Sequence, residues 1–251
     1  MLEVSEIVKS FGMTRVILGV SFTIEPGEIV SLVGPNGAGK TTLINLISGH
    51  LFPDSGRIAL SGKDITSASP YRRIKRGIVR NFQVTQLFEE LTVLDNVRNC
   101  IFSRNGQLRR FLRPADSYKE ATGEAMEILE LFNLAQFRDE TGGGLSEGDK
   151  KVLDTAMAFA LKSQFLLLDE PTSGVATADK FKVMDIIIDA IKDTGTATLI
   201  IEHDMDIVRD YTQRVMVLNQ GLILANGTPD DVMSDKEVQE TLFGVSNQDA
   251  S

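Results

Sequence analysis

A glycine-rich segment at residues 34–42 constrains the possible folds of this chain more than any other feature. It reads Gly-Pro-Asn-Gly-Ala-Gly-Lys-Thr-Thr and satisfies the G-x-x-x-x-G-K-[ST] pattern. The apolar, strand-like residues 28–33 precede it, and residues 43–47, with helical spacing, follow it and end near Gly49. The segment therefore predicts a strand, a glycine turn and a helix, which is the context that a phosphate-binding loop requires.

The residue types at the fixed positions fit a nucleoside triphosphate. Glycines let backbone N–H groups surround a phosphate without a side-chain clash, and the helix N-terminus adds its dipole. Lys40 is predicted to reach the β- and γ-phosphates, and the Thr41 hydroxyl to ligate Mg²⁺. An ordinary glycine turn is the alternative, but all four fixed positions recur by chance on the order of once per hundred such chains. The predicted nucleotide-binding residues of the loop are Gly34, Pro35, Asn36, Gly37, Ala38, Gly39, Lys40, Thr41 and Thr42.

Composition restricts the class of protein. The chain has 251 residues, of which 42% are hydrophobic, enough for one large α/β domain with a sizeable core. A net charge of −9 argues against a nucleic-acid-binding surface. No apolar run has the length of a membrane span, and the N-terminus lacks the pattern of a signal peptide. One cysteine and two histidines leave nothing for a structural zinc site or a disulfide. We therefore expect a soluble, cytosolic chain.

The first half of the chain carries mainly local signals. Residues 2–9 and 15–24 alternate apolar and polar and predict a β-hairpin, in which Phe11 fits the core at least as well as a binding site. Residues 71–76 predict a basic helix, and 104–113 form a second basic stretch. We expect the arginines of both to face solvent, because charge runs usually do. Contact of 104–113 with a membrane surface or a partner is the alternative. From residue 91 to 160 the pattern is helical, with Thr92 as a cap, an amphipathic helix over 118–132, and Ser146 opening the next helix.

The second half alternates strands and helices, which predicts a parallel sheet. The apolar strand 165–168 ends in Asp169-Glu170, and the strand 198–201 ends shortly before His203. Asp169 is placed to hold Mg²⁺ through water, and Glu170 to polarise the attacking water. His203 follows the next strand, at the edge where ligands bind in open α/β sheets.

Together these residues resemble a known family. Residues 34–42, Gln83, Leu145-Ser146-Glu147-Gly148, Asp169-Glu170 and His203 have the order and spacing of the ATP-binding subunit of an ABC transporter. The resemblance covers essentially the whole chain. It implies an α/β fold with a P-loop NTPase core of the ABC ATPase type, an N-terminal antiparallel β region and a helical subdomain. In this division one ATP-binding domain spans residues 1–251, with the β region and core at about 1–84 and 161–251, and the helical subdomain at about 85–160.

The resemblance also implies residue roles. Phe11 would stack on adenine with Val16 beside it, and Gln83 would sense Mg²⁺ and the γ-phosphate. Glu170 would be the general base and His203 the γ-phosphate switch. Ser146 and Gly148 would complete a nucleotide site on a second subunit, so that two chains sandwich two ATP molecules. The metal ligands would be Thr41, Gln83 and Asp169.

Further segments are similar to the ATPases of branched-chain amino-acid importers. They include residues 45–49, 62–66, 77–83, 87–93, Glu202-His203-Asp204-Met205 and Leu242-Phe243-Gly244. The similarity implies an ATP-hydrolysing motor on the inner face of the cell membrane. It would act with two transmembrane permease subunits, a second ATP-binding subunit and, indirectly, a solute-binding protein, without nucleic acid. The alternatives are the related ATPases of urea import or lipid export, a soluble non-transport ABC ATPase, or a nucleotide-binding scaffold that does not hydrolyse.

The chain departs from the family pattern at the signature segment. The family reads Leu-Ser-Gly-Gly-Gln where this chain has Glu147 and Asp149 at the third and fifth places, and Ala176 replaces the usual Asp or Asn. A carboxylate near a triphosphate is repulsive. These departures from the family pattern therefore favour a heterodimer with two unequal ATP sites, with a homodimer as the alternative.

Overall fold

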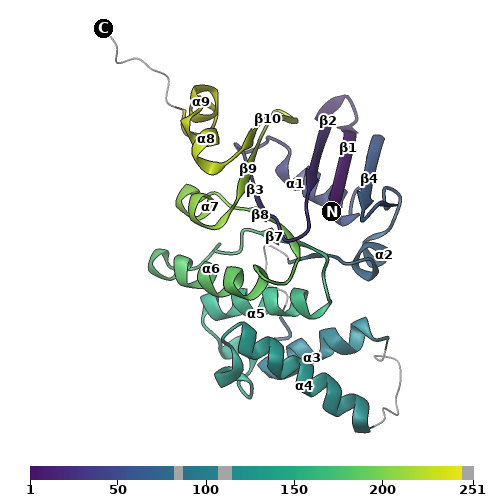
Figure 1. Cartoon of the computed structure of the whole chain (residues 1–251), viewed down its shortest axis with the longest axis vertical. Coiled ribbons are helices and arrows are strands. Elements are labelled where there is room, and N and C mark those ends of the chain that lie inside the picture. Colours follow the sequence, from purple (N-terminus) through teal and green to yellow (C-terminus); the bar gives the residue numbers. More distant parts are fainter. Residues whose placement is uncertain (82–86, 107–114, 245–251) are drawn as a thin grey trace. The chain divides into compact units, whose positions relative to one another are not determined.

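The structure is a computed structural model, and it describes residues 1–81, 87–106 and 115–244 (Figure 1). Contacts divide the chain into two compact units: residues 1–73 with 197–251, here called unit 1, and residues 74–196, called unit 2. The predicted helical subdomain falls within unit 2, and its boundaries stay a prediction. Within the described ranges, no helix is both long and apolar enough to cross a membrane.

Unit 1 contains an antiparallel sheet that includes the predicted hairpin. The sheet has the order β2-β1-β4-β5. β1 and β2 pair antiparallel, from Leu2 opposite Ile24 to Phe11 opposite Thr14. Successive side chains of a strand point to opposite faces, which is why the alternating pattern predicted this pair correctly. The strands are β1 (Leu2–Phe11), β2 (Thr14–Ile24), β4 (Ser55–Leu60) and β5 (Lys63–Asp64).

The remaining strands of unit 1 form a mainly parallel arrangement in the order β10-β9-β3-β8. β3 pairs in parallel with both β8 and β9, and β10 returns antiparallel to β9. Every residue of β3 and β8 is buried, which explains why both sequences are apolar except for Ser31 and Thr198. The strands are β3 (Ile29–Val33), β8 (Ala197–Ile201), β9 (Arg214–Asn219) and β10 (Leu222–Gly227).

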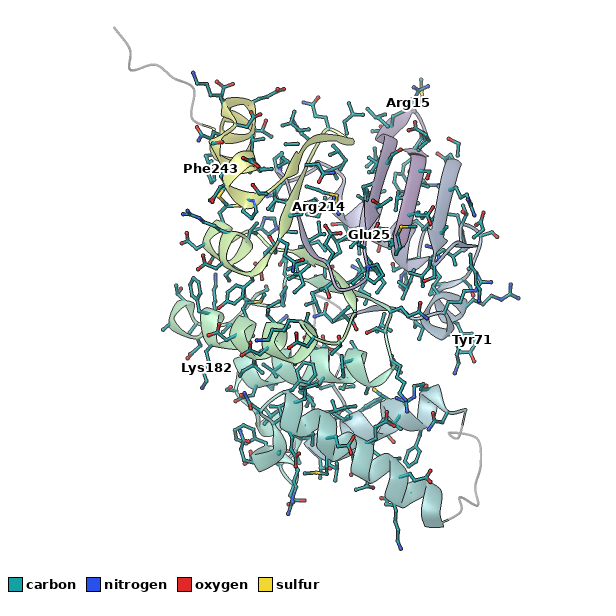
Figure 2. All side chains as sticks on the ribbon, in the orientation of Figure 1. Arg15, Glu25, Tyr71, Lys182, Arg214 and Phe243 are labelled. Atoms are coloured by element: carbon teal, nitrogen blue, oxygen red, sulfur yellow. The ribbon has the colours of Figure 1, made fainter. Side chains whose placement is uncertain are left out.

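An arginine fixes the start of the strand that leads to the phosphate loop. Arg214, labelled in Figure 2, donates to the two carboxylate oxygens of Glu28 at 2.6 and 3.0 Å. It also donates to the carbonyl of Thr23 at 2.7 Å. Because β3 begins at Ile29, this fork ties β9 to the turn that enters β3.

Three helices of unit 1, α7, α8 and α9, pack on its strands through a valine-rich core. Its buried members are Val33, Val208, Val215, Val217, Val232 and Val238. In Figure 1, α7, α8 and α9 lie along one side of β9 and β10. α7 was not predicted, because its seven residues carry too short an apolar pattern. The helices are α1 (Lys40–Ser48), α2 (Pro70–Lys75), which extends into unit 2, α7 (Met205–Tyr211), α8 (Pro229–Ser234) and α9 (Lys236–Phe243).

Unit 2 combines a parallel strand pair with a group of helices. β6 and β7 pair in parallel, with Arg80 opposite Leu167. The predicted amphipathic helix is confirmed, since Ala121, Ala125 and Leu129 of α4 are buried. The elements are β6 (Ile78–Arg80), β7 (Phe165–Asp169), α3 (Val93–Arg104), α4 (Ala115–Leu131), α5 (Glu147–Ala160), α6 (Thr177–Ile191), and the short 3₁₀ turns Ala135–Phe137 and Gly142–Gly144.

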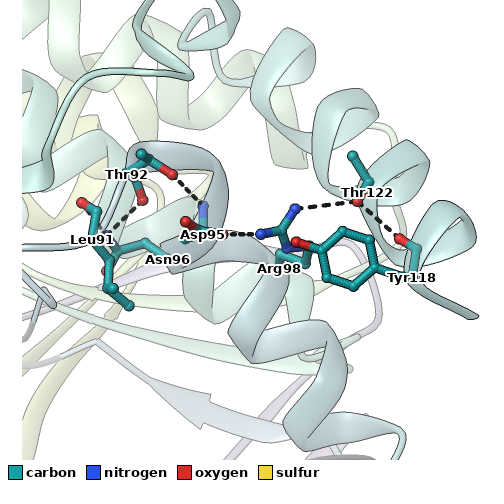
Figure 3. A network of polar contacts seen from close by, with 7 residues as sticks. All are labelled: Leu91, Thr92, Asp95, Asn96, Arg98, Tyr118 and Thr122. Carbon is teal, nitrogen blue, oxygen red and sulfur yellow. Dashed lines mark hydrogen bonds and ion pairs between the residues drawn. The ribbon is translucent and has the colours of Figure 1, made fainter. Parts of the chain in front are cut away.

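A polar network joins α3 to α4 (Figure 3). Thr92 caps α3 as predicted: its hydroxyl accepts from the Asp95 N–H at 3.0 Å. Arg98 pairs with Asp95 and donates to the Thr122 hydroxyl at 3.3 Å. The guanidinium carbon of Arg98 lies 4.4 Å from the centroid of the Tyr118 ring, a cation–π contact. These contacts fix α3 against α4 at the end where α3 begins.

The solvent-facing role predicted for the arginines of α2 is wrong for Arg73, which is fully buried. Its guanidinium donates to Ile47 O at 2.6 Å, to Thr66 O at 2.8 Å and to Leu46 O. Its Nε donates to Ala68 O at 3.0 Å. Helix C-termini leave carbonyls without intrahelical partners, and a cation there also opposes the dipole. Arg73 thus closes the C-terminal end of α1.

Candidate functional site

The phosphate loop occupies the turn between β3 and α1, as predicted. Gly34 follows the last residue of β3 and has φ of 154°. A Cβ at Gly34 would lie 2.1 Å from the Leu218 carbonyl oxygen, so this position requires glycine. Gly39 caps α1 in the left-handed region, with φ of 107°. The close approach of β9 and the left-handed cap together fold residues 34–39 into a tight loop.

The N-terminus of α1 presents backbone N–H groups that the helix itself does not use. An α-helix leaves the first turn of N–H groups without intrahelical acceptors, and its dipole makes this end positive. Among the described residues, no side chain caps α1, and its first turn holds no acidic residue. The arrangement is suited to an anion.

The loop's lysine and threonines differ in exposure. Lys40 is 9% exposed, and its ammonium donates to the carbonyls of Gly34 at 2.5 Å and Pro35 at 3.1 Å. The positive charge of Lys40 therefore lies next to the backbone of the loop. Thr41 is exposed and Thr42 half-buried at the start of α1. The hydroxyl of Thr41 is therefore accessible to a ligand.

Phe11 and Val16 lie on the hairpin of unit 1. Phe11 is 48% exposed, so the core position, one of its two predicted alternatives, is wrong. The Lys9 ammonium lies 5.7 Å from its ring centroid. Val16 adjoins the phosphate loop, since a Cβ at Gly39 would lie 3.1 Å from the Val16 carbonyl oxygen. Phe11 thus offers an accessible aromatic face, and Val16 a neighbour of the loop.

His203 lies beside the phosphate loop within unit 1. A cavity of about 310 Å³ is bordered by the loop, by the end of β8 and by α9. Its lining includes Pro35, Asn36, Glu202, His203 and Phe243. The His203 side chain is exposed, and the backbone N–H of His203 donates to a carboxylate oxygen of the buried Glu202 at 3.2 Å. His203 and residues 34–36 of the loop thus border the same cavity.

In unit 2, Asp169 and Glu170 stand at the carboxyl end of β7, as predicted. Asp169 is 8% exposed, and its carboxylate pairs with Arg80 at 2.7 Å. Its N–H donates to the side-chain oxygen of Asn81 at 2.8 Å. Glu170 is half-buried and has a positive φ of 52°. For a non-glycine residue this conformation is uncommon and costs energy, so the chain turns sharply directly after Asp169.

Arg80 and Asn81 were not predicted as site residues. A signal was present, because both follow a short apolar segment, as Asp169 does on β7. Carboxyl ends of parallel strands meet at one sheet edge. Gln83, predicted to sense the metal and the γ-phosphate, lies outside the described residues.

The signature segment forms the N-terminus of α5. Ser146 is the N-cap: its hydroxyl accepts from the Asp149 N–H at 3.2 Å and donates to the Asp149 carboxylate at 2.6 Å. Glu147 pairs with Lys150 at 2.9 Å. A cavity of about 320 Å³ lies here, and its lining includes Ser146, Gly148, Asp149, Ala176 and Asp179. The hydroxyl proton of Ser146 is thus already donated within the chain.

The donor types present fit a magnesium ion bound together with phosphate. Thr41 and Asp169 supply oxygen, which Mg²⁺ prefers. Among the described residues, no group of three or more His, Cys, Asp or Glu side chains is arranged to hold a metal. Mg²⁺ typically uses one or two protein oxygens and takes the rest from phosphates and water. The Cys100 thiol is no alternative ligand, because burial raises its pKa to about 12.

Comparison with known proteins identifies the family. The model of the ABC transporter family matches residues 17–173. The lipopolysaccharide export system ATP-binding protein LptB of Haemophilus influenzae is 35% identical over 245 residues, 97% of each chain. The high-affinity branched-chain amino acid transport ATP-binding protein BraF of Pseudomonas aeruginosa is 32% identical, and a probable LivG of Methanocaldococcus jannaschii is 35% identical, each over 97% of both chains.

A solved structure agrees with the fold over the whole chain. The ADP conformation of MJ1267, an ATP-binding cassette of an ABC transporter, has a TM-score of 0.83 and 34% identity. The match covers 98% of this chain and 99% of that one. The predicted α/β fold of the ABC ATPase type is thereby confirmed. Since the family match exceeds half of the chain and the relatives match nearly all of it, this chain belongs to the ABC transporter family as an ATP-binding subunit with ATPase activity.

Proposed function

We propose that this chain energises a membrane importer for branched-chain or other hydrophobic amino acids. The observation that carries the proposal is the near full-length similarity to BraF and LivG, whose names describe branched-chain amino acid transport. Segments around Gln83 and at Leu242-Phe243-Gly244 support it, because they are similar to the same importer ATPases.

A second candidate is export of a lipid. It is favoured by the similarity to LptB, which is 35% identical over 97% of both chains. The two candidates share the ATPase and differ in the permeases that bind it.

The nucleotide roles follow the chemistry of unit 1. ATP places its phosphates on the loop, where Lys40 and the N–H groups at the start of α1 compensate their charge. The exposed ring of Phe11 stacks on adenine, with Val16 beside it. His203 contacts the γ-phosphate, a role supported by the cavity that it shares with Pro35 and Asn36.

The hydrolytic roles involve both units. Glu170 accepts a proton from the attacking water, because it follows the strand that delivers Asp169. Thr41 and Asp169 hold Mg²⁺ together with Gln83, and their joint coordination is proposed from the family resemblance alone. When bound, Mg²⁺ compensates negative charge on the phosphate oxygens.

The partners are two permease subunits, a second ATP-binding subunit and, indirectly, a solute-binding protein. Through the permeases the chain is held on the inner face of the cell membrane. Ser146 and Gly148 complete the nucleotide site of the second subunit. We propose a heterodimer, because the Ser146 hydroxyl already donates to Asp149 and two carboxylates flank it. The site built on Lys40 of this chain turns over quickly, and the site completed by Ser146 slowly.

The test is to purify the tagged chain from its native membranes in mild detergent and to identify what co-purifies. Two permeases with a second, different ATPase are expected, and uptake of radiolabelled leucine should require the chain. A strain carrying Glu170→Gln should retain the assembled complex and lose uptake. Permeases that move a lipid would favour the second candidate. A soluble partner without membrane proteins would remove the transport proposal and leave the ATPase.

A further inference from the structure

Unit 2 holds a buried ion pair at the position of a proposed metal ligand. Arg80 ends β6, Asp169 ends β7, and the two strands pair in parallel. A guanidinium nitrogen of Arg80 lies 2.7 Å from Oδ2 of Asp169, and each side chain is 11% exposed. A carboxylate so little exposed to water requires a compensating charge, and Arg80 supplies it.

The backbone at Asp169 is held separately from this pair. Asn81, which is 3% exposed, accepts from the Asp169 N–H at 2.8 Å through its side chain. Its own N–H donates to the Leu167 carbonyl at 3.0 Å. The strand end is therefore fixed by Asn81, while Arg80 contacts the carboxylate of Asp169. Removal of the Arg80 charge should therefore change the electrostatic potential at the Asp169 carboxylate more than the position of the Asp169 backbone.

We propose that Arg80 is a positioning residue that competes with the divalent cation for Asp169. The inference rests on the proposed role of Asp169 as a metal ligand. The N–H group of Arg80 occupies an oxygen of the carboxylate, and its positive charge repels a second cation nearby. Arg80 holds the carboxylate in one orientation before the metal binds, and it raises the metal concentration at which the site fills.

The test measures Mn²⁺ binding to the full chain by electron paramagnetic resonance, with a non-hydrolysable ATP analogue present. Arg80→Gln keeps a donor for Asp169 and removes the charge. We expect its half-saturating Mn²⁺ concentration to fall on the order of tenfold. Arg80→Lys, which keeps the charge, should stay near the wild-type value. Arg80→Met provides a second neutral variant, so the measurement does not depend on the folding of one.

Arg104→Gln is the matched control. Arg104 pairs with Glu124 at 2.6 Å with side-chain exposure similar to that of Arg80, but Glu124 has no proposed metal role. Mn²⁺ affinity should not change in this variant. Unchanged or weaker Mn²⁺ binding in Arg80→Gln would overturn the proposal. Asp169→Asn separates the two questions: if it binds Mn²⁺ as the wild type does, the metal role of Asp169 fails, and with it the premise.

Discussion

The N-termini of α1 and α5 have the same helical backbone but differ in the side chains that surround their first turns. Both helices expose unused N–H groups and the positive end of a dipole. At α1 a left-handed glycine leads into the helix, and no acidic residue stands in its first turn. At α5 Ser146 caps the helix, and Glu147 and Asp149 stand in the first turn. In the part of the chain that the structure describes, the N-terminus of α1 has no anionic side chain of its own and can accept an external anion. The N-terminus of α5 already has two carboxylates in its first turn.

A helix N-terminus can bind an external phosphate only where its first-turn N–H groups are not already used. A capping side chain and first-turn carboxylates stabilise a helix. They also occupy backbone N–H groups and neutralise the positive end of the dipole, both of which a phosphate would use. α1 gives up that local stabilisation and depends on Lys40 and the loop instead. Variants at the start of α1 and at the start of α5 should therefore have different effects on ATP hydrolysis.

The largest effect is expected at the lysine of α1. Lys40→Ala should lower ATP hydrolysis about 10²- to 10³-fold, because it removes a preorganised cation at the phosphates. Lys150→Ala is the matched control: Lys150 lies near the start of α5 and pairs with the exposed Glu147. An exposed pair contributes little, so hydrolysis should hardly change.

Steady-state hydrolysis and binding of a fluorescent ATP analogue would check both variants, with circular dichroism to verify folding. Equal losses in the two variants would contradict the contrast between α1 and α5.

A smaller effect, with the opposite sign, is expected at α5. Glu147→Gly combined with Asp149→Gln should raise ATP turnover of the assembled complex by about threefold to tenfold, because two charges that repel a partner's triphosphate are removed. The Ser146 cap remains in this variant.

Turnover of the purified membrane complex is the measurement, and Glu237→Gln, an acidic residue in the first turn of α9, is the control. If the double variant turns over ATP at the wild-type rate, the proposal of unequal sites is wrong.

The sequence predicted those parts of the site that depend on neighbours in the chain. The phosphate loop, the hairpin and the caps Thr92 and Ser146 follow from patterns a few residues long, and the structure has them as predicted. The strand ends at Asp169 and His203 were found because a buried apolar run has an evident last residue. Local chemistry sufficed for these features.

The misses are contacts between distant residues. Arg73 looked like one charge in a basic run, but its acceptors are carbonyls of α1 and of the segment before α2. Asp169, which pairs with Arg80, is 89 residues away in the sequence, so no local pattern predicts this pair. Phe11 could be core or site until its exposure was known. The positive charge of an arginine does not indicate from the sequence whether its guanidinium will donate to buried acceptors.

The smallest predicted effect isolates the cap of α5. Ser146→Ala removes the acceptor for the Asp149 N–H, which should lower the free energy of unfolding by about 1 kcal/mol. For a chain of this size the melting temperature should fall by about 2 to 4 °C.

Differential scanning calorimetry without nucleotide would measure this, with Ser67→Ala, an exposed serine outside the helices, as control. ATP stabilises whichever state binds it, by about 2.7 kcal/mol at a concentration 100 times its dissociation constant. With the proposed ATP site of the isolated chain at α1, the ATP-induced shift in melting temperature should be the same in Ser146→Ala and in wild type. A smaller shift in the variant would mean that α5 takes part in binding within one chain, and the division of roles between the two helices would fail.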